Sequence, residues 1–174
     1  IPFCARLCYY CGCNMRVVND YAPVADYLSL LKREMSLVSA QTGGPSRVTH
    51  IHFGGGSPTM VAATDFGGLM QSIRDHFEVA NDAEVSIEAD PRNMSEARIA
   101  AYAKAGVTRI SLGVQDFNDD VLESINRPQP YHVTHEAVAL CRAYGLNRIN
   151  FDLMYGLPGQ TPEKIRRNME LAVM

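Results

Sequence analysis

Polar and apolar residues alternate along several segments of the chain that have the composition of β-strands. These segments are 48–53, 84–90, 108–116 and 147–156. In the second of them, for example, Ile87 lies between Ser86 and Glu88. Because the side chains of a strand switch faces with a period of two, we expect each strand to have one apolar face and one polar face.

Helical patterns separate these strands. The predicted helices cover 23–39, 65–77, 95–105, 119–125 and 131–144, and a last one begins at Pro162 after the N-cap Thr161. Parallel strands need such long crossovers, so the order of elements predicts a parallel sheet. Strands of a parallel sheet that are buried on both faces form continuous apolar runs, and these strands do not. We therefore predict an α/β fold in the form of a partial, TIM-like (β/α) barrel with parallel strands and a polar lumen.

The carboxyl ends of the predicted strands carry glycine or polar residues. They are Gly54, Gly55, Gly56, Ser57, Glu88, Asp90, Gln115 and Asp152. Barrels and open α/β sheets bind their ligands at this edge. The alternative is that these groups only satisfy one another, or that the strands end in solvent. We favour a lumen that holds a ligand.

Length and charge exclude some classes of function. A chain of 174 residues with 47% hydrophobic residues is sufficient for one domain with a real core. A net charge of -3 and a pI near 5.9 give no basic surface for nucleic acid. No apolar run reaches the roughly 18 residues of a membrane-spanning helix, so we expect no membrane span.

The cysteines are the most distinctive feature of the sequence. Cys4, Cys8, Cys11 and Cys13 lie within ten residues, in CARLCYYCGC, whereas Cys141 is far away. Such a local cluster is unlike a disulfide framework and indicates reduced thiols, as in the cytosol. Thiolates bind zinc or iron–sulfur clusters. Because the spacings are three, two and one residues in one loop and no second half of a zinc site follows, an iron–sulfur cluster is favoured. Zinc, or thiols that serve redox chemistry or packing, remain alternatives.

The first two cysteine spacings resemble those of the radical S-adenosylmethionine (SAM) enzymes. This resemblance implies a barrel of the radical SAM type, in which Cys4, Cys8 and Cys11 bind three irons of a [4Fe–4S] cluster. The fourth iron would then be open to S-adenosylmethionine. Cys13 should not be a ligand, because a fourth thiolate would close that position.

A narrower resemblance covers essentially the whole chain. IPFCARLCYYCGCN, HFGGGSPT, SIEADPR, SLGVQDFN, INRPQ and FDLMYGLPGQTPE are similar to motifs of the oxygen-independent coproporphyrinogen III oxidase (coproporphyrinogen dehydrogenase) family. Related heme chaperones share the glycine and YGLPGQT motifs, but they typically carry an aromatic residue where this chain has Cys13. Only the segment 4–14 therefore separates the enzyme from the alternative, a radical SAM protein that binds and delivers heme.

The resemblance implies an oxidoreductase of heme (porphyrin) biosynthesis. Two propionates of coproporphyrinogen III would become vinyl groups, giving protoporphyrinogen IX, after a 5′-deoxyadenosyl radical removes hydrogen. An electron donor for the cluster and a terminal electron acceptor are implied as partners, and we expect a cytoplasmic monomer. Because the chain starts at Ile1 and stops in a helical pattern, we expect 1–174 to be one catalytic barrel domain from a longer protein. The start of that protein, later strands and a C-terminal domain would be missing.

The same resemblance assigns roles to single residues. Gly55 and Glu88 would contact a first S-adenosylmethionine. A second molecule would contact Tyr10, Gly56, Ser57, Gln115, Arg127 and Asp152. Ser57 departs from the threonine usual in the family but keeps the hydroxyl group. Cys13 would be catalytic. Taken alone, Glu88 could be a surface acid, Arg127 a solvated charge and Tyr10 a shield for the cluster.

Other polar residues share the lumen face without an assigned role. They are His50, His52, Arg109 and Arg148. We expect them to be hydrogen-bonded residues of the lumen, and partners of the substrate propionates are the alternative.

Overall fold

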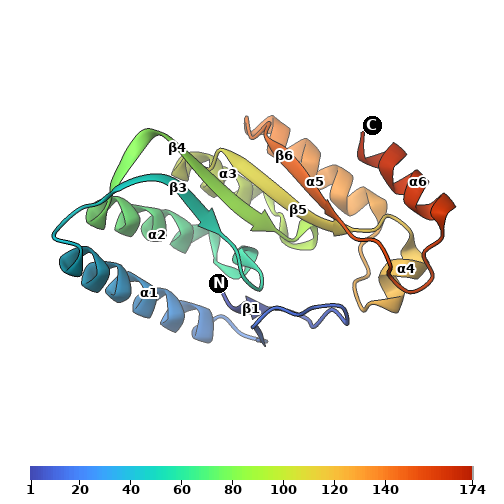
Figure 1. Cartoon of the computed structure of the whole chain (residues 1–174), viewed down its shortest axis with the longest axis horizontal. Coiled ribbons are helices and arrows are strands. Elements are labelled where there is room, and N and C mark those ends of the chain that lie inside the picture. Colours follow the sequence, from blue (N-terminus) through green and yellow to red (C-terminus); the bar gives the residue numbers. More distant parts are fainter. Residues whose placement is uncertain (174) are drawn as a thin grey trace.

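The computed structural model describes residues 1–173, and a parallel sheet lies at its centre (Figure 1). Its order is β3 (Arg47–Phe53), β4 (Glu78–Ala89), β5 (Arg109–Gln115) and β6 (Ile149–Leu153). All neighbouring strands are parallel. The predicted α/β fold with parallel strands is therefore confirmed, and within residues 1–173 the sheet is open at β3 and β6.

The boundaries of two strands differ from the prediction. β4 begins at Glu78, because Glu78 and Val79 pair with the start of β3 before the register shifts to His50 and Glu84. Residues 80–83 form the irregularity between these two paired stretches, and they lack the regular alternation that would have predicted the early start. β6 is shorter than the predicted segment 147–156, since pairing with β5 covers only Ile149–Leu153.

Helices follow the strands in the predicted order. They are α1 (Ala22–Gln41), α2 (Ala63–His76), α3 (Glu96–Ala105), α4 (Asp119–Ser124), α5 (Tyr131–Ala143) and α6 (Pro162–Ala172), with short 3-10 turns η1 (Pro58–Met60) and η2 (Pro91–Asn93). The cap of α6 is as predicted: the Thr161 hydroxyl accepts from Lys164 N at 3.4 Å, and Pro162 begins the helix. Among residues 1–173 no helix combines the length and the apolar character needed to cross a bilayer.

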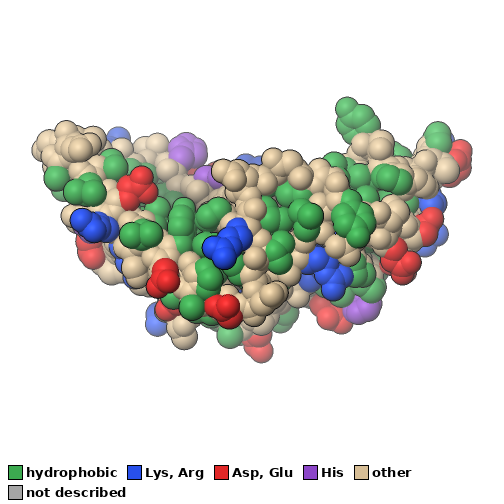
Figure 2. All heavy atoms as spheres, turned by 90° about the horizontal axis from the view of Figure 1, so that it is seen from below, with side chains coloured by type: hydrophobic (Ala, Val, Ile, Leu, Met, Phe, Trp, Pro, Cys, Tyr) green, Lys and Arg blue, Asp and Glu red, His purple; other side chains and the backbone are tan. Residues whose placement is uncertain are grey.

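The apolar face of the sheet packs against the helix layer, which lies behind the sheet in Figure 1. In β5 every second residue is buried, and Ile110 and Leu112 are fully enclosed. Phe66 of α2 joins the two layers, with its ring 5.0 Å from that of Phe53 and 4.7 Å from that of Tyr102. Seen from below in Figure 2, the molecule has a strongly convex lower outline, and the helix layer forms this side.

The opposite face of the sheet is polar, as the alternation predicts. A hollow of about 370 Å³ on this face is lined by His52, Glu84, Ser86, Ile87, Glu88, Arg109, Ser111, Asn150 and Asp152. Glu84 accepts from Arg148 at 2.6 Å and lies 3.6 Å from Arg109. Within the described residues, the arginines therefore pair with a carboxylate of the protein. The expected hydrogen bonding is confirmed for Arg148 and for His52, whose Nδ1 lies 2.9 Å from Ser86 Oγ. Within residues 1–173, Arg109 instead forms an ion pair, and His50 hydrogen-bonds only with its neighbour Thr49.

A short parallel pair precedes the sheet. β1 (Phe3–Cys4) and β2 (Arg16–Val17) are joined by the segment that carries the clustered cysteines. We call residues 4–15 the cysteine loop. The pair places this loop beside the carboxyl ends of β3, β4 and β5, because Ile1 O accepts from Gly56 N at 2.9 Å.

Candidate functional site

A cavity of about 210 Å³ lies where the cysteine loop faces the carboxyl ends of the strands. All twelve residues singled out from the sequence line it: Cys4, Cys8, Tyr10, Cys11, Cys13, Gly55, Gly56, Ser57, Glu88, Gln115, Arg127 and Asp152. They come from separate parts of the chain, and the fold alone brings them together. Their convergence is confirmed, whereas their individual roles stay predictions.

The four clustered thiols differ in exposure. Cys8 is buried, Cys4 and Cys11 are half-buried and Cys13 is exposed. Burial, followed by the charges of Cys11 and Cys8, raises the pKa of Cys4 to about 11. A hydrogen bond with Cys11 raises the pKa of Cys13. Thiols crowded in this way are hard to ionise at the same time, because the thiolates would repel one another. A bound metal centre has the opposite effect, since it favours the deprotonated form of the thiols that bind it.

The arrangement of the thiols fits a group larger than one ion. Among residues 1–173, no three His, Cys, Asp or Glu side chains converge closely enough to bind a single metal ion. Cys4, Cys8 and Cys11 instead border a shared cavity. Soft thiolates spread around a cavity suit an iron–sulfur cluster better than zinc.

Gly55 and Gly56 form the seam between the cysteine loop and the sheet. A Cβ atom on Gly55 would lie 2.9 Å from Ile1 O, and one on Gly56 would lie 2.9 Å from Phe3 O. Gly55 also has a φ of +119°, which side chains rarely adopt. Sequence reasoning attributed these glycines to the approach of a ligand. The close passage of the N-terminal strand is a second reason for them, and it depends on the tertiary structure.

Arg127 is buried, with 6% of its surface exposed, so it is not a solvated charge. Its Nη1 donates to Cys8 Sγ at 3.7 Å and its Nη2 donates to Gly113 O at 2.6 Å. The buried Nε has no acceptor among the described residues. This side chain therefore contacts the cysteine loop and keeps one donor free.

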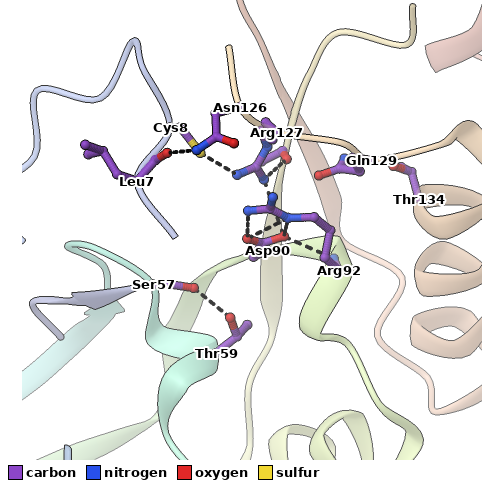
Figure 3. A network of polar contacts seen from close by, with 11 residues as sticks. Leu7, Cys8, Ser57, Thr59, Asp90, Arg92, Asn126, Arg127, Gln129 and Thr134 are labelled. Carbon is purple, nitrogen blue, oxygen red and sulfur yellow. Dashed lines mark hydrogen bonds and ion pairs between the residues drawn. The ribbon is translucent and has the colours of Figure 1, made fainter. Parts of the chain in front are cut away.

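Asp90 and Arg92 complete this polar group (Figure 3). Sequence reasoning placed Asp90 at the ligand-binding edge without assigning it a contact, and it gave Arg92 no role. Asp90 accepts from Arg92 N at 3.0 Å and from Arg92 Nη2 at 2.6 Å, and it lies 3.5 Å from Arg127 Nη2. Burial by itself would raise the pKa of Asp90, but the hydrogen bonds of Arg92 and the charge of Arg127 outweigh it and lower that pKa. The i, i+2 spacing of Asp90 and Arg92 after a strand was the available signal.

Polar pairs hold the other cavity residues. Glu88 Oε1 lies 3.3 Å from His52 Nε2, and Ser57 Oγ lies 2.7 Å from Thr59 Oγ1. Both oxygens of Asp152 accept from Ser111 Oγ at 2.9 Å. These side chains are positioned before any ligand is bound.

Gln115 sits in a strained backbone position at the end of β5. Its φ is +68°, which is uncommon for a residue with a side chain and is found most often at functional sites. Asp116, which follows it, is buried and accepts from Asn118 N, Gln160 Nε2 and Asn168 Nδ2 at 2.6, 2.6 and 2.9 Å. Asp116 had no signal in the sequence beyond its place in the motif, because its partners are up to 52 residues away.

Tyr10 lies between two of the cysteines and is part of a small apolar cluster. It packs against Val121, Leu122, Ile125 and Leu157. Burial raises its pKa to about 12, so the phenol is neutral. Tyr10 therefore joins this apolar cluster to the lining of the cavity.

Comparison with known proteins identifies the family. Residues 1–172 match the profile of the Radical SAM superfamily. The chain belongs to this superfamily. Its sequence is 42% identical over 176 residues to the oxygen-independent coproporphyrinogen III oxidase of Bradyrhizobium diazoefficiens, a match that covers 99% of this chain and 39% of that protein. The protein of the same name from Pseudomonas aeruginosa is 38% identical, with 98% of this chain and 37% of that protein covered.

A solved structure agrees with these relatives. Coproporphyrinogen III oxidase (HemN) from Escherichia coli, described as a radical SAM enzyme, superimposes with a TM-score of 0.93 and 36% identity over 99% of this chain and 39% of that chain. The radical SAM methyltransferase TsrM from Kitasatospora setae has a TM-score of 0.65 at 20% identity, over 98% of this chain and 32% of that chain, and supports the fold alone. The chain spans about two fifths of the length of the curated relatives that it matches.

Proposed function

We propose that this chain forms the cluster-bearing catalytic barrel of an oxygen-independent coproporphyrinogen III oxidase in the cytoplasm. The substrate would be coproporphyrinogen III, and two of its propionates would be decarboxylated to vinyl groups. One observation carries the proposal: Cys4, Cys8, Cys11 and Cys13 share one cavity with the predicted cofactor-binding residues. The proposal is supported by relatives that are named oxygen-independent coproporphyrinogen III oxidase and whose sequences are 36–42% identical to this chain.

The cavity suits a [4Fe–4S] cluster and S-adenosylmethionine. Cys4, Cys8 and Cys11 would bind the cluster, because three thiolates leave one iron open. When bound, the cluster and S-adenosylmethionine together supply one-electron chemistry that attacks an unactivated C–H bond. The protein contributes binding, orientation and protection from water.

The strand ends provide both negatively and positively charged contacts for S-adenosylmethionine. By the family resemblance, two molecules of it would be bound. Glu88 and Asp152 are carboxylates that can accept from an ammonium group or from ribose hydroxyls. Arg127 suits a carboxylate because a guanidinium binds it with paired donors, and its buried Nε is without an acceptor in the described structure. Gly55, Gly56, Ser57 and Gln115 would contact the two molecules from the ends of β3 and β5.

Two further side chains of the cysteine loop act beside the cluster. Tyr10 would contact the second S-adenosylmethionine and exclude water from the thiols. Cys13 is exposed on the cavity and is hydrogen-bonded to Cys11, so its thiol can reach a bound molecule without closing the open iron. An electron donor and a terminal electron acceptor complete the reaction, and we propose that the protein acts as a monomer.

The test is an anaerobic assay of the holoenzyme with dithionite, S-adenosylmethionine, an electron acceptor and coproporphyrinogen III. Release of carbon dioxide together with protoporphyrinogen IX is the expected result. Cys13→Ala should keep its iron and sulfide but lose decarboxylation, because it is outside the predicted ligand set. Cys141→Ala, in α5 and away from the cavity, is the matched control and should keep both.

Other outcomes distinguish the alternatives. Retention of heme without decarboxylation, in protein with an intact reduced cluster, would overturn the enzyme and favour a heme chaperone. Colourless protein that contains stoichiometric zinc would overturn the cluster itself.

A further inference from the structure

One buried carboxylate holds two guanidiniums beside the predicted cluster ligand Cys8. Figure 3 shows Arg92 and Arg127 gathered at Asp90, with Cys8 beside Arg127. Arg92 binds Asp90 with its backbone N, Nε and Nη2, at 2.6–3.0 Å for the closest contact of each. Arg127 reaches the same carboxylate at 3.5 Å and the Cys8 sulfur at 3.7 Å. The exposed fractions of the side chains are 12% for Asp90, 22% for Arg92 and 7% for Arg127.

The charges of this group do not balance. Two cations and one anion leave a net charge of +1 in a largely buried place. Within residues 1–173, Asp90 is the only carboxylate that forms an ion pair with either arginine. A buried charge is costly unless it is paired and hydrogen-bonded. Arg127 donates to the neutral carbonyl oxygen of Gly113 at 2.6 Å and to the Cys8 sulfur at 3.7 Å, and of these two acceptors only the sulfur can carry a negative charge, when it binds a metal.

We propose that Arg92 is a positioning residue that, through Asp90, sets the charge beside the Cys8 thiolate and so raises the reduction potential of the bound cluster. This inference rests on the proposed function, because it requires the cluster. Arg92 saturates one side of Asp90 and directs Arg127 toward both Asp90 and the sulfur. Without Arg92, the charge of Asp90 would balance that of Arg127, and the group would have no net positive charge beside the Cys8 sulfur.

The direction of the effect follows from electrostatics. Reduction adds one negative charge to the cluster, and a neighbouring cation stabilises the more negative state. Net charge and hydrogen bonds to the sulfurs are the main means by which a protein adjusts such potentials. Arg92→Met should therefore shift the reduction equilibrium about tenfold toward the oxidised cluster, which corresponds to about 59 mV for a one-electron couple.

The experiment measures the midpoint potential of the cluster in the reconstituted holoenzyme by a redox titration followed by electron paramagnetic resonance. S-adenosylmethionine is left out, because its carboxylate at Arg127 would offset the surplus cation. The expected order is a lowered potential for Arg92→Met and a potential near that of the wild type for Arg92→Lys, which keeps the charge. The double variant Asp90→Asn/Arg92→Met removes one charge of each sign and should return toward the wild type. Arg74→Met removes an exposed cation that does not line the cavity, and should have no effect.

Two results would overturn the inference while leaving the proposed function intact. One is an unchanged potential in Arg92→Met with normal iron and sulfide content, and the other is an equal shift in Arg74→Met. If Arg92→Met does not load the cluster, Arg92→Gln takes its place with the same expected shift, since it removes the charge but keeps hydrogen-bond donors. Wild-type protein that binds no cluster would instead overturn the proposed function.

Discussion

The two sides of the cavity are stabilised in different ways. The strand ends (54–57, 88–92 and 113–116) are fixed by the parallel sheet, by buried polar groups and by the helix layer behind them. The cysteine loop has only two short strands at its ends and a few hydrogen bonds along its length. Tyr9 N donates to Ile125 O at 3.0 Å, and Asn126 Nδ2 donates to Leu7 O at 2.7 Å. One side is therefore rigid before a ligand binds, and the other gains most from the metal.

This difference teaches that cofactor loading and folding stability can be separated by mutation. Changes in the cysteine loop should remove the cluster with little loss of stability. Changes at the strand ends should lower the free energy of unfolding as well. The variants below test this contrast, from the largest expected effect to the smallest.

The largest effect is expected from replacing a cluster ligand. Cys4→Ala, Cys8→Ala and Cys11→Ala should each abolish cluster binding and activity, because the cluster depends on cysteine thiolates. The apo forms of Cys4→Ala and Cys11→Ala should unfold close to the apo wild type, since both thiols are only half-buried. Iron and sulfide analysis, with chemical unfolding of the apo proteins, measures both quantities. A ligand variant that keeps a normal cluster would contradict the assignment.

At the strand ends, Asp116→Ala should lower the free energy of unfolding by about 3 kcal/mol, because it removes the acceptor of Gln160 Nε2 and leaves the amide of the buried Asn168 without its recorded acceptor. Equilibrium denaturation in urea is the measurement. Glu123→Ala, an exposed acid in α4, serves as the control and should stay within about 0.5 kcal/mol of the wild type. Equal stability of Asp116→Ala and the wild type would show that this network does not anchor the rigid side.

The pH dependence of the same carboxylate sharpens the test. Burial alone would raise the pKa of Asp116, but hydrogen bonds from Gln160, Asn118 and Asn168 outweigh it and lower that pKa in the folded protein. Its contribution to stability is therefore present above the ordinary aspartate pKa of about 3.9 and is lost as the pH falls through the lower folded value. In this acidic window the free energy of unfolding of the wild type, measured by denaturation curves, should fall as the pH is lowered. That of Asp116→Asn should fall less steeply.

The seam between the two sides is tested by Gly55→Ala. The φ of +119° and the approach of a Cβ atom to Ile1 O should destabilise the protein by about 2 kcal/mol and displace the strand that leads into the cysteine loop. Gly67→Ala is the matched control, because a Cβ atom there meets nothing within 4 Å. In the middle of α2 it should stabilise by roughly 0.5–1 kcal/mol. Thermal unfolding of both variants gives the comparison, and an equal effect of the two would refute the packing argument.

The smallest effect is expected on the cysteine loop itself. Asn126→Ala removes the hydrogen bond to Leu7 O and should cost about 1 kcal/mol. Asn126→Gly removes the same hydrogen bond but suits the φ of +57°, so it separates the two contributions. Hydrogen exchange in the loop should quicken in both variants while exchange in β4 and β5 stays unchanged. Faster exchange in the strands would mean that the two sides are not independent.

Most of the fold was readable because it depends on local periodicity. Alternation in 108–116 predicted both faces of β5, and Thr161-Pro162 predicted the start of α6. Glu78–Ala83 of β4 was missed, because its pairing with β3 crosses an irregularity that leaves no periodic signal. For the site, the cysteine spacing, the strand-end residues and the family resemblance predicted which residues meet, but not how they contact one another. Arg127 is the clearest case, since nothing local shows that its guanidinium is buried against Cys8.

The sequence by itself determined the parallel α/β fold, the polar strand face and the clustered cysteines, because these follow from spacing along the chain. The other residues of the cavity were predicted partly from the resemblance of the sequence motifs to those of a known family. Only the tertiary structure decided the contact of Asp90 with Arg127, the need for glycine at 55 and 56, and the burial of Asp116. These features join segments that are distant in the sequence. Their energies come from burial and from unbalanced charge, which exist only after the chain has folded.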